Sequence, residues 1–322
     1  MDPRDKTSVM AQDGSMLIVV NPDADRGRGL RKAEAVASLL QQRGVRAAIH
    51  HTTGSGDAGV ATRRACRNRD LRPGCVVACG GDGTIQEVAA ALASLRAELG
   101  TACPRLGLAP AGRCNDFARA LGVTPDPRMI TETLCNGAAR PIDLGRVNGR
   151  YFCTVVTIGV DADISSYVDG MKMPLKGTIA YLYGTLRVLG RYRGRALRIE
   201  GDFGVIEHSV CVASTANTSS YGGGIRIAPE AVPDDGLLDL CVIDHVSKRR
   251  MVTLLPKVVR GRHSQEPEVR FVKTRKLHID ALEVTELWAD GERIARTPAT
   301  IEVAPAAVRI IMPAGWNEHT PC

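Results

Sequence analysis

The first part of the chain repeats one pattern: a short apolar run, a loop rich in Gly, Asp or Asn, and an amphipathic segment. The apolar runs are MLIVV, RAAIH, CVVAC and RLGLA. Short strands that alternate with longer helices predict a parallel sheet with helices on both faces. The loops after the strands then meet at one edge of the sheet, where ligands bind. We expect this doubly wound α/β domain over residues 16–142, after a flexible terminus at residues 1–15.

The pattern changes near Asp143. Beyond it come short runs of alternating or β-branched residues, such as YFCTVVTIGV and LLDLCVID, separated by turn residues. This pattern is typical of a β-sandwich or barrel, and we expect a β-sandwich domain over residues 143–305. Residues 176–192 and 245–263 interrupt it with a helical pattern. A last strand near residues 306–312 is expected to return to the first domain, so the fold class is α/β plus β.

Composition and charge narrow the class of protein. The 322 residues are 44% hydrophobic and 24% charged, as in folded globular proteins. The apolar run at residues 16–20 is far shorter than a membrane span, the fifteen residues before it contain no apolar stretch of signal-peptide length, and we expect a cytoplasmic protein. The ten cysteines form no CxxC pair, which predicts reduced thiols. The net charge of +7 favours an anionic partner: a nucleotide, a nucleic acid or an acidic membrane.

The loop GGDGT, residues 80–84, follows the run CVVAC. Its glycines leave the backbone free to adopt positive φ, so that successive N–H groups can face phosphate oxygens. Thr84 and Glu87 have the spacing of a capping box, which would start a helix whose positive end faces the same spot. The alternative is a strand-to-helix turn that Asp82 caps. Asp82 favours the phosphate site, because a carboxylate beside a phosphate is repulsive unless it holds a metal or a substrate hydroxyl.

Further polar loops follow the other predicted strands. The loop after RLGLA contains Gly112, then Asn115 as the expected N-cap of the next helix, and Asp116, which would face the same crevice. Asn21 begins another backbone loop before a helix. Thr52 either donates its hydroxyl to a phosphate or caps the next helix. Together these positions predict one anion site at the sheet edge.

Four segments, in this order, closely resemble the soluble diacylglycerol kinase and sphingosine kinase family of lipid kinases: GGDGTIQEV, PAGRCNDFARALG, YGGGIRIAPEAVPDDGLLDL and WADGE. The resemblance covers about residues 21–312. GGDG alone is unspecific, since NAD kinases and phosphofructokinases carry it, but those enzymes lack the other elements. The resemblance implies a phosphofructokinase/NAD kinase-like first domain that binds ATP and a second domain that binds the lipid. The implied reaction is ATP- and Mg²⁺-dependent phosphorylation of a lipid alcohol such as diacylglycerol.

The resemblance also implies the nucleotide contacts. The matching positions are Asn21, Thr52, Gly80, Gly81, Asp82, Gly83, Thr84, Ile85, Gln86, Gly112, Arg113, Asn115 and Asp116. Asp82 and Asp116 would hold the catalytic magnesium ion, directly or through water. Arg113 stands where the family pattern has threonine. A guanidinium binds phosphate in a forked geometry that a hydroxyl cannot adopt, so either ATP binding uses this route or the phosphate position is altered.

The resemblance also implies functional roles for two turns of the second domain. By itself, PDDGLLD is a turn into a strand with Gly236 at positive φ. The resemblance implies a structural magnesium ion there, and its ligands would be the Asp235 carboxylate and the carbonyls of Val232 and Leu237. A turn without metal is the alternative.

The tripeptide Asp290-Gly291-Glu292 is by itself a hairpin turn. The resemblance implies that it supplies the acidic base of phosphoryl transfer, a reaction that otherwise requires positioning and charge neutralisation. We assign Glu292 as the base, with Asp290 as the alternative or partner.

Two basic clusters suggest how the chain meets a lipid. They are Arg187, Arg191, Arg193, Arg195 and Arg198, and Lys248, Arg249, Arg250, Lys257, Arg260 and Arg262. Basic side chains near an anionic leaflet contribute about 1 kcal/mol each. Our hypothesis is peripheral association with the inner face of the membrane, and the alternative is a solvated helix face. A homodimer is left open, and no nucleic-acid partner is expected.

Other functions are compatible with the same motifs. The acceptor could be a sphingoid base, ceramide, another glycerolipid or NAD, although the full-length pattern disfavours NAD. A non-catalytic nucleotide- or lipid-binding regulator is the alternative from another class. The retained Asp82, Asp116, Asp290 and Glu292 argue against it, because a regulator has no chemical use for all four.

Overall fold

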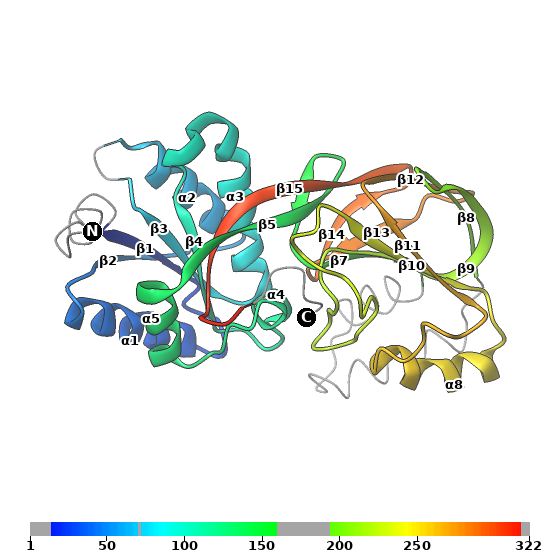
Figure 1. Cartoon of the computed structure of the whole chain (residues 1–322), viewed down its shortest axis with the longest axis horizontal. Helices are drawn as coiled ribbons and strands as arrows, with labels where there is room; N and C mark the ends of the chain where they lie inside the picture. The colour runs from blue at the N-terminus through cyan, green and yellow to red at the C-terminus, as the bar shows by residue number, and fades with distance from the viewer. Residues whose placement is uncertain (1–13, 70–71, 160–193, 317–322) are drawn as a thin grey trace, which may run out of the picture. The chain divides into compact units, whose positions relative to one another are not determined.

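The computed structural model describes residues 14–69, 72–159 and 194–316, which form two compact units (Figure 1). The first unit comprises the described residues up to Asp143 together with those from Ala306 onward. The second comprises those between Leu144 and Pro305. The predicted helix at residues 176–192 lies outside the described residues. In the part of the chain that the structure describes, no helix is long and apolar enough to cross a bilayer.

A parallel sheet forms the centre of the first unit. Its strands, in the order β15-β4-β3-β1-β2, are β1 (Ser15–Val20), β2 (Arg46–His51), β3 (Cys75–Gly80), β4 (Arg105–Pro110) and the end of β15 (Ala299–Met312). Every residue of β3 is buried, as expected of a central strand that is covered on both faces. The last strand reaches this sheet through the pairing of Ile310 with Leu106.

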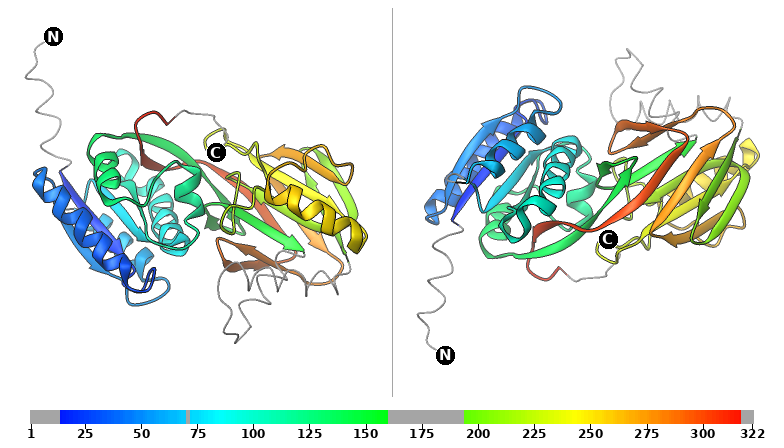
Figure 2. Two further views of the ribbon diagram at one scale, coloured as in Figure 1. Left: turned by 90° about the horizontal axis from the view of Figure 1, so that it is seen from below. Right: turned by 90° about the horizontal axis from the view of Figure 1, so that it is seen from above.

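Helices cover both faces of this sheet (Figures 1 and 2). They are α1 (Arg28–Gln42), α2 (Asp57–Arg67), α3 (Asp82–Leu99), α4 (Asp116–Ala120) and α5 (Pro127–Asn136), with a short 3₁₀ helix, η2 (Gly100–Ala102). On one face, α1 packs against α5, and on the other α2 packs against α3. Ala33, Val36 and Leu40 form the buried stripe of α1, because their spacing puts them on one side of the helix. The unit is the expected doubly wound α/β domain.

The second unit is β-sandwich-like. Its strands are the end of β5 (Ala138–Val147), β6 (Arg150–Phe152), β7 (Val155–Gly159), β8 (Arg195–Gly201), β9 (Gly204–Ala216), β10 (Leu238–Asp244), β11 (Val269–Thr274), β12 (Lys276–Ala281), β13 (Glu286–Ala289), β14 (Glu292–Arg296) and the first part of β15. Neighbouring strands are antiparallel, in the order β14-β13-β7-β9-β8-β12-β15, and β10 pairs with β9 and β11. Separate apolar clusters pack around Phe152 and around Cys241.

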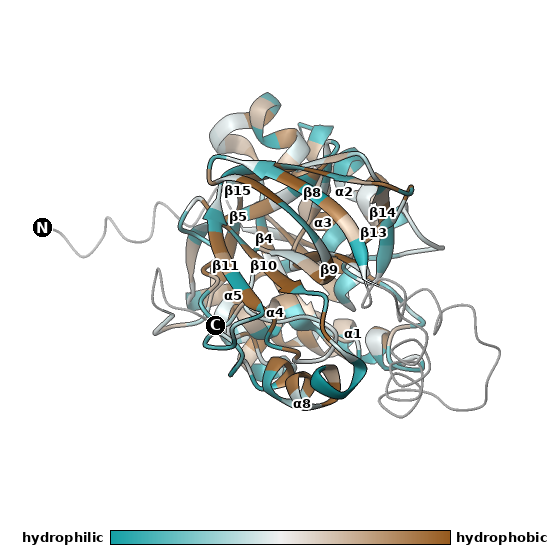
Figure 3. Cartoon of the chain, turned by 90° about the vertical axis from the view of Figure 1, so that its right-hand side faces the viewer, coloured by the Kyte–Doolittle hydropathy of each residue, from teal (hydrophilic) through white to brown (hydrophobic). Residues whose placement is uncertain are grey.

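One helix, α8 (Lys248–Val259), lies within the predicted helical segment at residues 245–263. Hydrophilic and hydrophobic segments follow one another along it (Figure 3). Arg250 donates to Glu268 through Nε (2.8 Å) and to Glu266 through Nη2 (2.5 Å), and Lys257 donates to Glu266 (2.7 Å). Hydrogen bonds from Lys257 and Arg250 lower the pKa of Glu266, and the hydrogen bond from Arg250 lowers the pKa of Glu268. These ion pairs tie α8 to the loop before β11.

Removal of Arg250 is expected to reduce the acid sensitivity of folding. Because the pKa of both glutamates is lower in the folded chain, the stability they contribute is present above the ordinary glutamate pKa of about 4.3 and is lost as the pH falls through the folded value. Arg250→Gln is therefore expected to lower the melting temperature at neutral pH and to flatten its fall between about pH 5 and pH 3. Thermal denaturation as a function of pH measures this. Arg249→Gln is the control, and equally steep curves for both variants would contradict the prediction.

Candidate active site

The loop between β3 and α3 has a geometry that differs from the predicted one. The helix begins at Asp82 with Gly81 as its N-cap, and Gly81 has φ −83° rather than a positive value. No side chain caps this end of α3 in the described structure. Glu87 instead accepts hydrogen bonds from the backbone N–H groups of Gly56 (2.7 Å) and Gly59 (3.3 Å). The predicted capping box is therefore wrong, because α3 starts before Thr84 and the Glu87 side chain binds the N–H groups at the start of α2. The positive φ predicted for this loop is also wrong.

These loops require glycine because neighbouring atoms leave no space for a β-carbon, and not because of positive φ. A β-carbon on Gly112 would lie 2.5 Å from the Cα atom of Gly81, and one on Gly80 would lie 2.5 Å from Oγ1 of Thr84. The backbone N–H of Ala111 donates to the carbonyl of Gly80 (2.8 Å) and extends the pairing of β3 with β4 into the loops. The loops after β3 and β4 therefore contact each other backbone to backbone.

Asn115 fixes the second loop from within. It stands at the N-cap position of α4 with φ 51°, but its side chain caps no N–H group of the helix. Its Oδ1 atom accepts from the N–H of Gly112 (2.7 Å), and its Nδ2 atom donates to the carbonyl of Gly112 (2.9 Å). The predicted position is confirmed, whereas the predicted capping contact is wrong, since the side chain closes its own loop.

Two carboxylates, those of Asp82 and Asp116, lie at this edge of the sheet, at the starts of α3 and α4. Asp82 Oδ1 accepts from the N–H of Phe117 (3.3 Å), and the buried Asp116 pairs with Arg119 (3.2 Å). Burial, followed by the charges of Asp116 and Asp82, raises the pKa of the Cys114 thiol, so both acids lie near that residue. Carboxylate oxygens suit Mg²⁺, which usually takes one or two carboxylates and fills its shell with water and substrate phosphates. The pair therefore fits a catalytic magnesium ion in its identity and number of ligands.

The loops after β1 and β2 adjoin the same edge. The N–H of Asn21 donates to the carbonyl of Cys79 (3.1 Å), and the N–H of Thr52 donates to the carbonyl of Val20 (2.9 Å). Thr52 does not cap α2, whose N-cap is Gly56. Arg113 is exposed on the loop after β4. The structure thus brings the positions predicted for the nucleotide to adjoining loops of one sheet edge.

One further residue at this edge was not predicted. Lys32 Nζ, from the second turn of α1, donates to the carbonyl of Pro110 at the end of β4. Burial lowers the pKa of Lys32. A signal was available, because Lys32 follows the buried Gly29 by three positions and precedes Val36 by four, on the inward face of the helix. It supplies a positive charge close to the loop that contains Asp116.

In the second unit, Asp290 and Glu292 have different environments. Asp290 Oδ2 accepts from the N–H of Cys153 (2.7 Å), and Oδ1 accepts from the N–H (2.9 Å) and hydroxyl (2.5 Å) of Thr154. Asn217 adds a bond from Nδ2 to the carbonyl of Cys153 (2.9 Å). Glu292 is exposed at the start of β14, and its side chain has no hydrogen bond or ion pair within the described ranges. Asp290 therefore fixes the hairpin, and Glu292 is available for chemistry.

The turn predicted for the structural magnesium ion has a different occupant. Gly236 has φ 74°, as expected for this turn. Asp235 Oδ1 accepts from the N–H of Leu237 (2.9 Å), and Oδ2 accepts from Nζ of Lys273 on β11 (2.8 Å). Val232 is buried beside the turn. Because both oxygens of the Asp235 carboxylate already have donors, one of them an ammonium group, the arrangement does not fit the expected metal ion.

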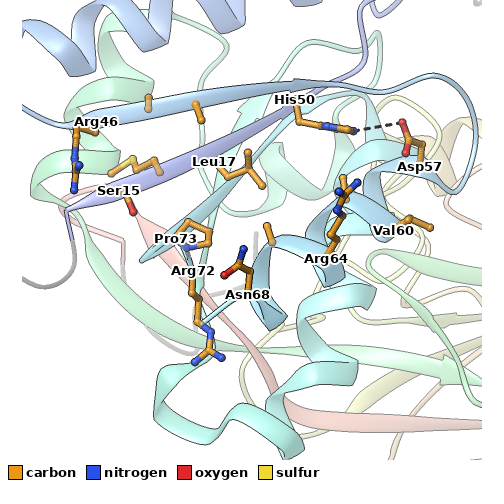
Figure 4. A pocket seen from close by; sticks show the side chains of 15 residues that line it. Ser15, Leu17, Arg46, His50, Asp57, Val60, Arg64, Asn68, Arg72 and Pro73 are labelled. Atoms are coloured by element: carbon orange, nitrogen blue, oxygen red, sulfur yellow. Dashed lines mark hydrogen bonds and ion pairs between the residues drawn. The ribbon is translucent and has the colours of Figure 1, made fainter. Parts of the chain in front are cut away.

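A cavity of about 750 Å³ lies elsewhere in the first unit, between β2 and α2 (Figure 4). Leu17, Val60 and Arg64 are among its lining residues, and His50 and Asp57 interact at its edge (3.4 Å). None of the residues predicted for the nucleotide, the base or the metal ions lines it. The size of this cavity is therefore no guide to the chemistry.

Family models match almost the whole chain. Residues 15–147 match the diacylglycerol kinase catalytic domain, and residues 154–312 match the YegS C-terminal NAD kinase beta sandwich-like domain. The chain is 30% identical over 298 residues to a diacylglycerol kinase of Bacillus subtilis (strain 168), which covers 92% of this chain and 95% of that protein. A diacylglycerol kinase of Mycobacterium tuberculosis (strain ATCC 25618 / H37Rv) is 30% identical over 308 residues, 93% of this chain and 96% of that protein.

A solved structure gives the same result. A crystal structure from Bacillus anthracis str. Sterne, whose name places it among the diacylglycerol kinases, superposes with a TM-score of 0.78 at 26% identity. The match covers 95% of this chain and 97% of that chain. The similarity therefore extends over both units.

Substitution of Asp290 is expected to destabilise the second unit. Asp290→Ala leaves the N–H groups of Cys153 and Thr154 without their acceptor, which is expected to cost about 2–4 kcal/mol of unfolding free energy. Urea denaturation measures this loss. Glu292→Ala is the matched control, and its cost should lie within about 0.5 kcal/mol because the side chain is exposed. Equal stability of the two variants would show that the Asp290 contacts contribute nothing.

Proposed function

The chain belongs to the diacylglycerol kinase family of lipid kinases, and on that premise we propose that it transfers the γ-phosphate of ATP to the hydroxyl of a lipid such as diacylglycerol. One observation carries the proposal: at the carboxyl edge of a parallel sheet, two loops in direct backbone contact lead into helices that begin with Asp82 and Asp116, and Asp82 Oδ1 accepts from the N–H of Phe117, the residue after Asp116. This is the location in which α/β proteins bind phosphorylated ligands.

The start of α3 supplies favourable electrostatics for the phosphates. The helix extends over Asp82–Leu99, and its first N–H groups have no partner from an N-cap side chain. Such an end attracts anions through its N–H groups and the helix dipole. In our proposal the ATP phosphates bind here and contact residues 80–86, with Asn21, Thr52, Arg113 and Asn115 on the adjoining loops.

Magnesium would be held by Asp82 and Asp116. When bound, the ion neutralises phosphate charge and stabilises the transferred group. Asp116 is already oriented by its ion pair with Arg119, and Asp82 by the N–H of Phe117. These contacts hold the two acids in position before the ion arrives.

Glu292 is the better candidate for the base that accepts the hydroxyl proton. Both oxygens of Asp290 accept hydrogen bonds from Cys153 and Thr154, so this carboxylate is committed to the fold. The Glu292 carboxylate is exposed. In this assignment Asp290 positions the hairpin that carries Glu292.

The outer surface of α8 suits a peripheral contact with anionic lipid. Lys248, Arg249 and Arg260 are exposed there, and Val252 and Val259 are 60% and 42% exposed. Basic residues beside exposed apolar side chains are typical of helices that lie on membranes. Of the basic residues predicted for membranes, three at positions 187–193 lie outside the described residues. Others are engaged in ion pairs: Arg198, Arg250 and Lys257.

Phosphorylation assays test the proposed reaction. The wild type is incubated with labelled ATP, with and without Mg²⁺, and with diacylglycerol, another glycerolipid, a sphingoid base, ceramide or NAD. We expect Mg²⁺-dependent transfer to a lipid alcohol. In Glu292→Gln, kcat is expected to fall by about 10²–10⁴-fold because the proton acceptor is lost, while ATP affinity changes little.

Glu283→Gln is the control for this assay, since Glu283 is exposed before the same hairpin. Near-normal turnover of Glu292→Gln would refute its assignment as the base. ATP binding without transfer to any acceptor would refute the kinase proposal and favour a regulator. Transfer to a sphingoid base, ceramide or NAD instead would correct the substrate.

Vesicle sedimentation tests the α8 surface. Binding to vesicles that contain anionic phospholipid is expected to weaken when Arg249 and Arg260 are both replaced by Gln, by roughly tenfold or more from about 1 kcal/mol per residue. Salt should weaken wild-type binding in the same way. The control replaces Arg198, which pairs with Glu200 and Glu207 on β8 and β9. Binding that depends neither on the anionic lipid content of the vesicles nor on salt would refute the membrane contact.

A further inference from the structure

The turn before β10 contains a lysine between two carboxylates. Lys273 Nζ donates to Oδ2 of Asp235 (2.8 Å) and to Oδ2 of Asp239 (3.2 Å). Its position is fixed by strand register, because Lys273 lies directly opposite Asp239 in the antiparallel pair of β10 and β11. The ammonium group therefore cannot leave the two acids without a change of rotamer or of strand pairing.

The environment of these acids requires a cation. The side chain of Asp239 is only 8% exposed and that of Asp235 is 20% exposed. Carboxylates that lose water contacts need a compensating charge, and Lys273 provides it.

We propose that the Lys273 ammonium group is the resident cation of this turn and takes the place of the structural magnesium ion that family resemblance implies. Both oxygens of Asp235 have donors, one from Leu237 and one from Lys273. A divalent ion at Asp235 would have to displace Lys273 or lie beside its positive charge.

If Lys273 takes the place of the structural magnesium ion, the structural and catalytic roles of magnesium are separated. The turn and the pairing of β10 with β11 hold together without a metal ion, because their charge is balanced by a side chain of the same sheet. Any requirement for Mg²⁺ then belongs to Asp82 and Asp116 in the first unit. The inference concerns folding and metal content, and it stands whether or not the proposed kinase activity is found.

Metal binding and thermal stability of the nucleotide-free full chain test the proposal. Mn²⁺ binding is measured by electron paramagnetic resonance, and melting temperatures are measured in EDTA and in Mg²⁺. The wild type and the Asp235→Asn variant should bind the same number of Mn²⁺ ions. Lys273→Met should lower the melting temperature in EDTA by about 4–8 °C, since it leaves two acids without their cation. Mg²⁺ should restore part of this loss, and Lys273→Met/Asp235→Asn should abolish the restoration.

Lys276→Met is the control, because Lys276 is exposed on β12, the next strand in sequence. It should melt as the wild type does in both buffers. The proposal is overturned if the wild type binds a Mn²⁺ ion that Asp235→Asn removes, a test that does not depend on the stability of any Lys273 variant. It is also overturned if Lys273→Met melts at the wild-type temperature in EDTA.

Discussion

The candidate nucleotide site depends on one contact, the approach of the Gly112 backbone to that of Gly81. A β-carbon on Gly112 would lie 2.5 Å from Cα of Gly81, so any other residue would push the loops apart. The same contact follows from the parallel pairing of β3 with β4, which the hydrogen bond from Ala111 to Gly80 extends by one step. Because Asp82 and Asp116 start the helices that follow these loops, this contact also places the two acids at the same edge of the sheet.

The acidic residues considered for the function differ in the groups that contact their carboxylates. Asp290 is bound by backbone N–H groups and a hydroxyl, and Asp235 is bound by an N–H group and an ammonium group. These donors make both carboxylates part of the fold. Glu292, two positions after Asp290, is exposed and has no such donors within the described part of the chain. The different environments of neighbouring carboxylates thus distinguish a positioning residue from the candidate base.

Much of the fold could be predicted from apolar runs. The runs MLIVV, RAAIH, CVVAC and RLGLA lie in β1 to β4. In β1, β3 and β4 most residues are buried, and buried parallel strands require nearly continuous apolar residues. The local capping rules were less reliable. The T-x-x-E spacing of Thr84 and Glu87 predicted a capping box, yet Glu87 binds the start of α2, which is distant in sequence. Asn115 likewise binds its own loop rather than the helix it precedes.

The sequence by itself determined the doubly wound domain, the sandwich-like second unit and the kinase family. Periodicity depends only on residues close in sequence, and the order of the motifs can be read directly along the chain. Only the tertiary structure decided the roles of individual acids. Asp290 and Cys153 are 137 positions apart, and Lys273 and Asp235 are 38 positions apart. No spacing rule connects such residues, since their contacts arise from strand register. A hydrogen bond can form only when the sheet has assembled, and so the partner of a charged residue is a property of the fold.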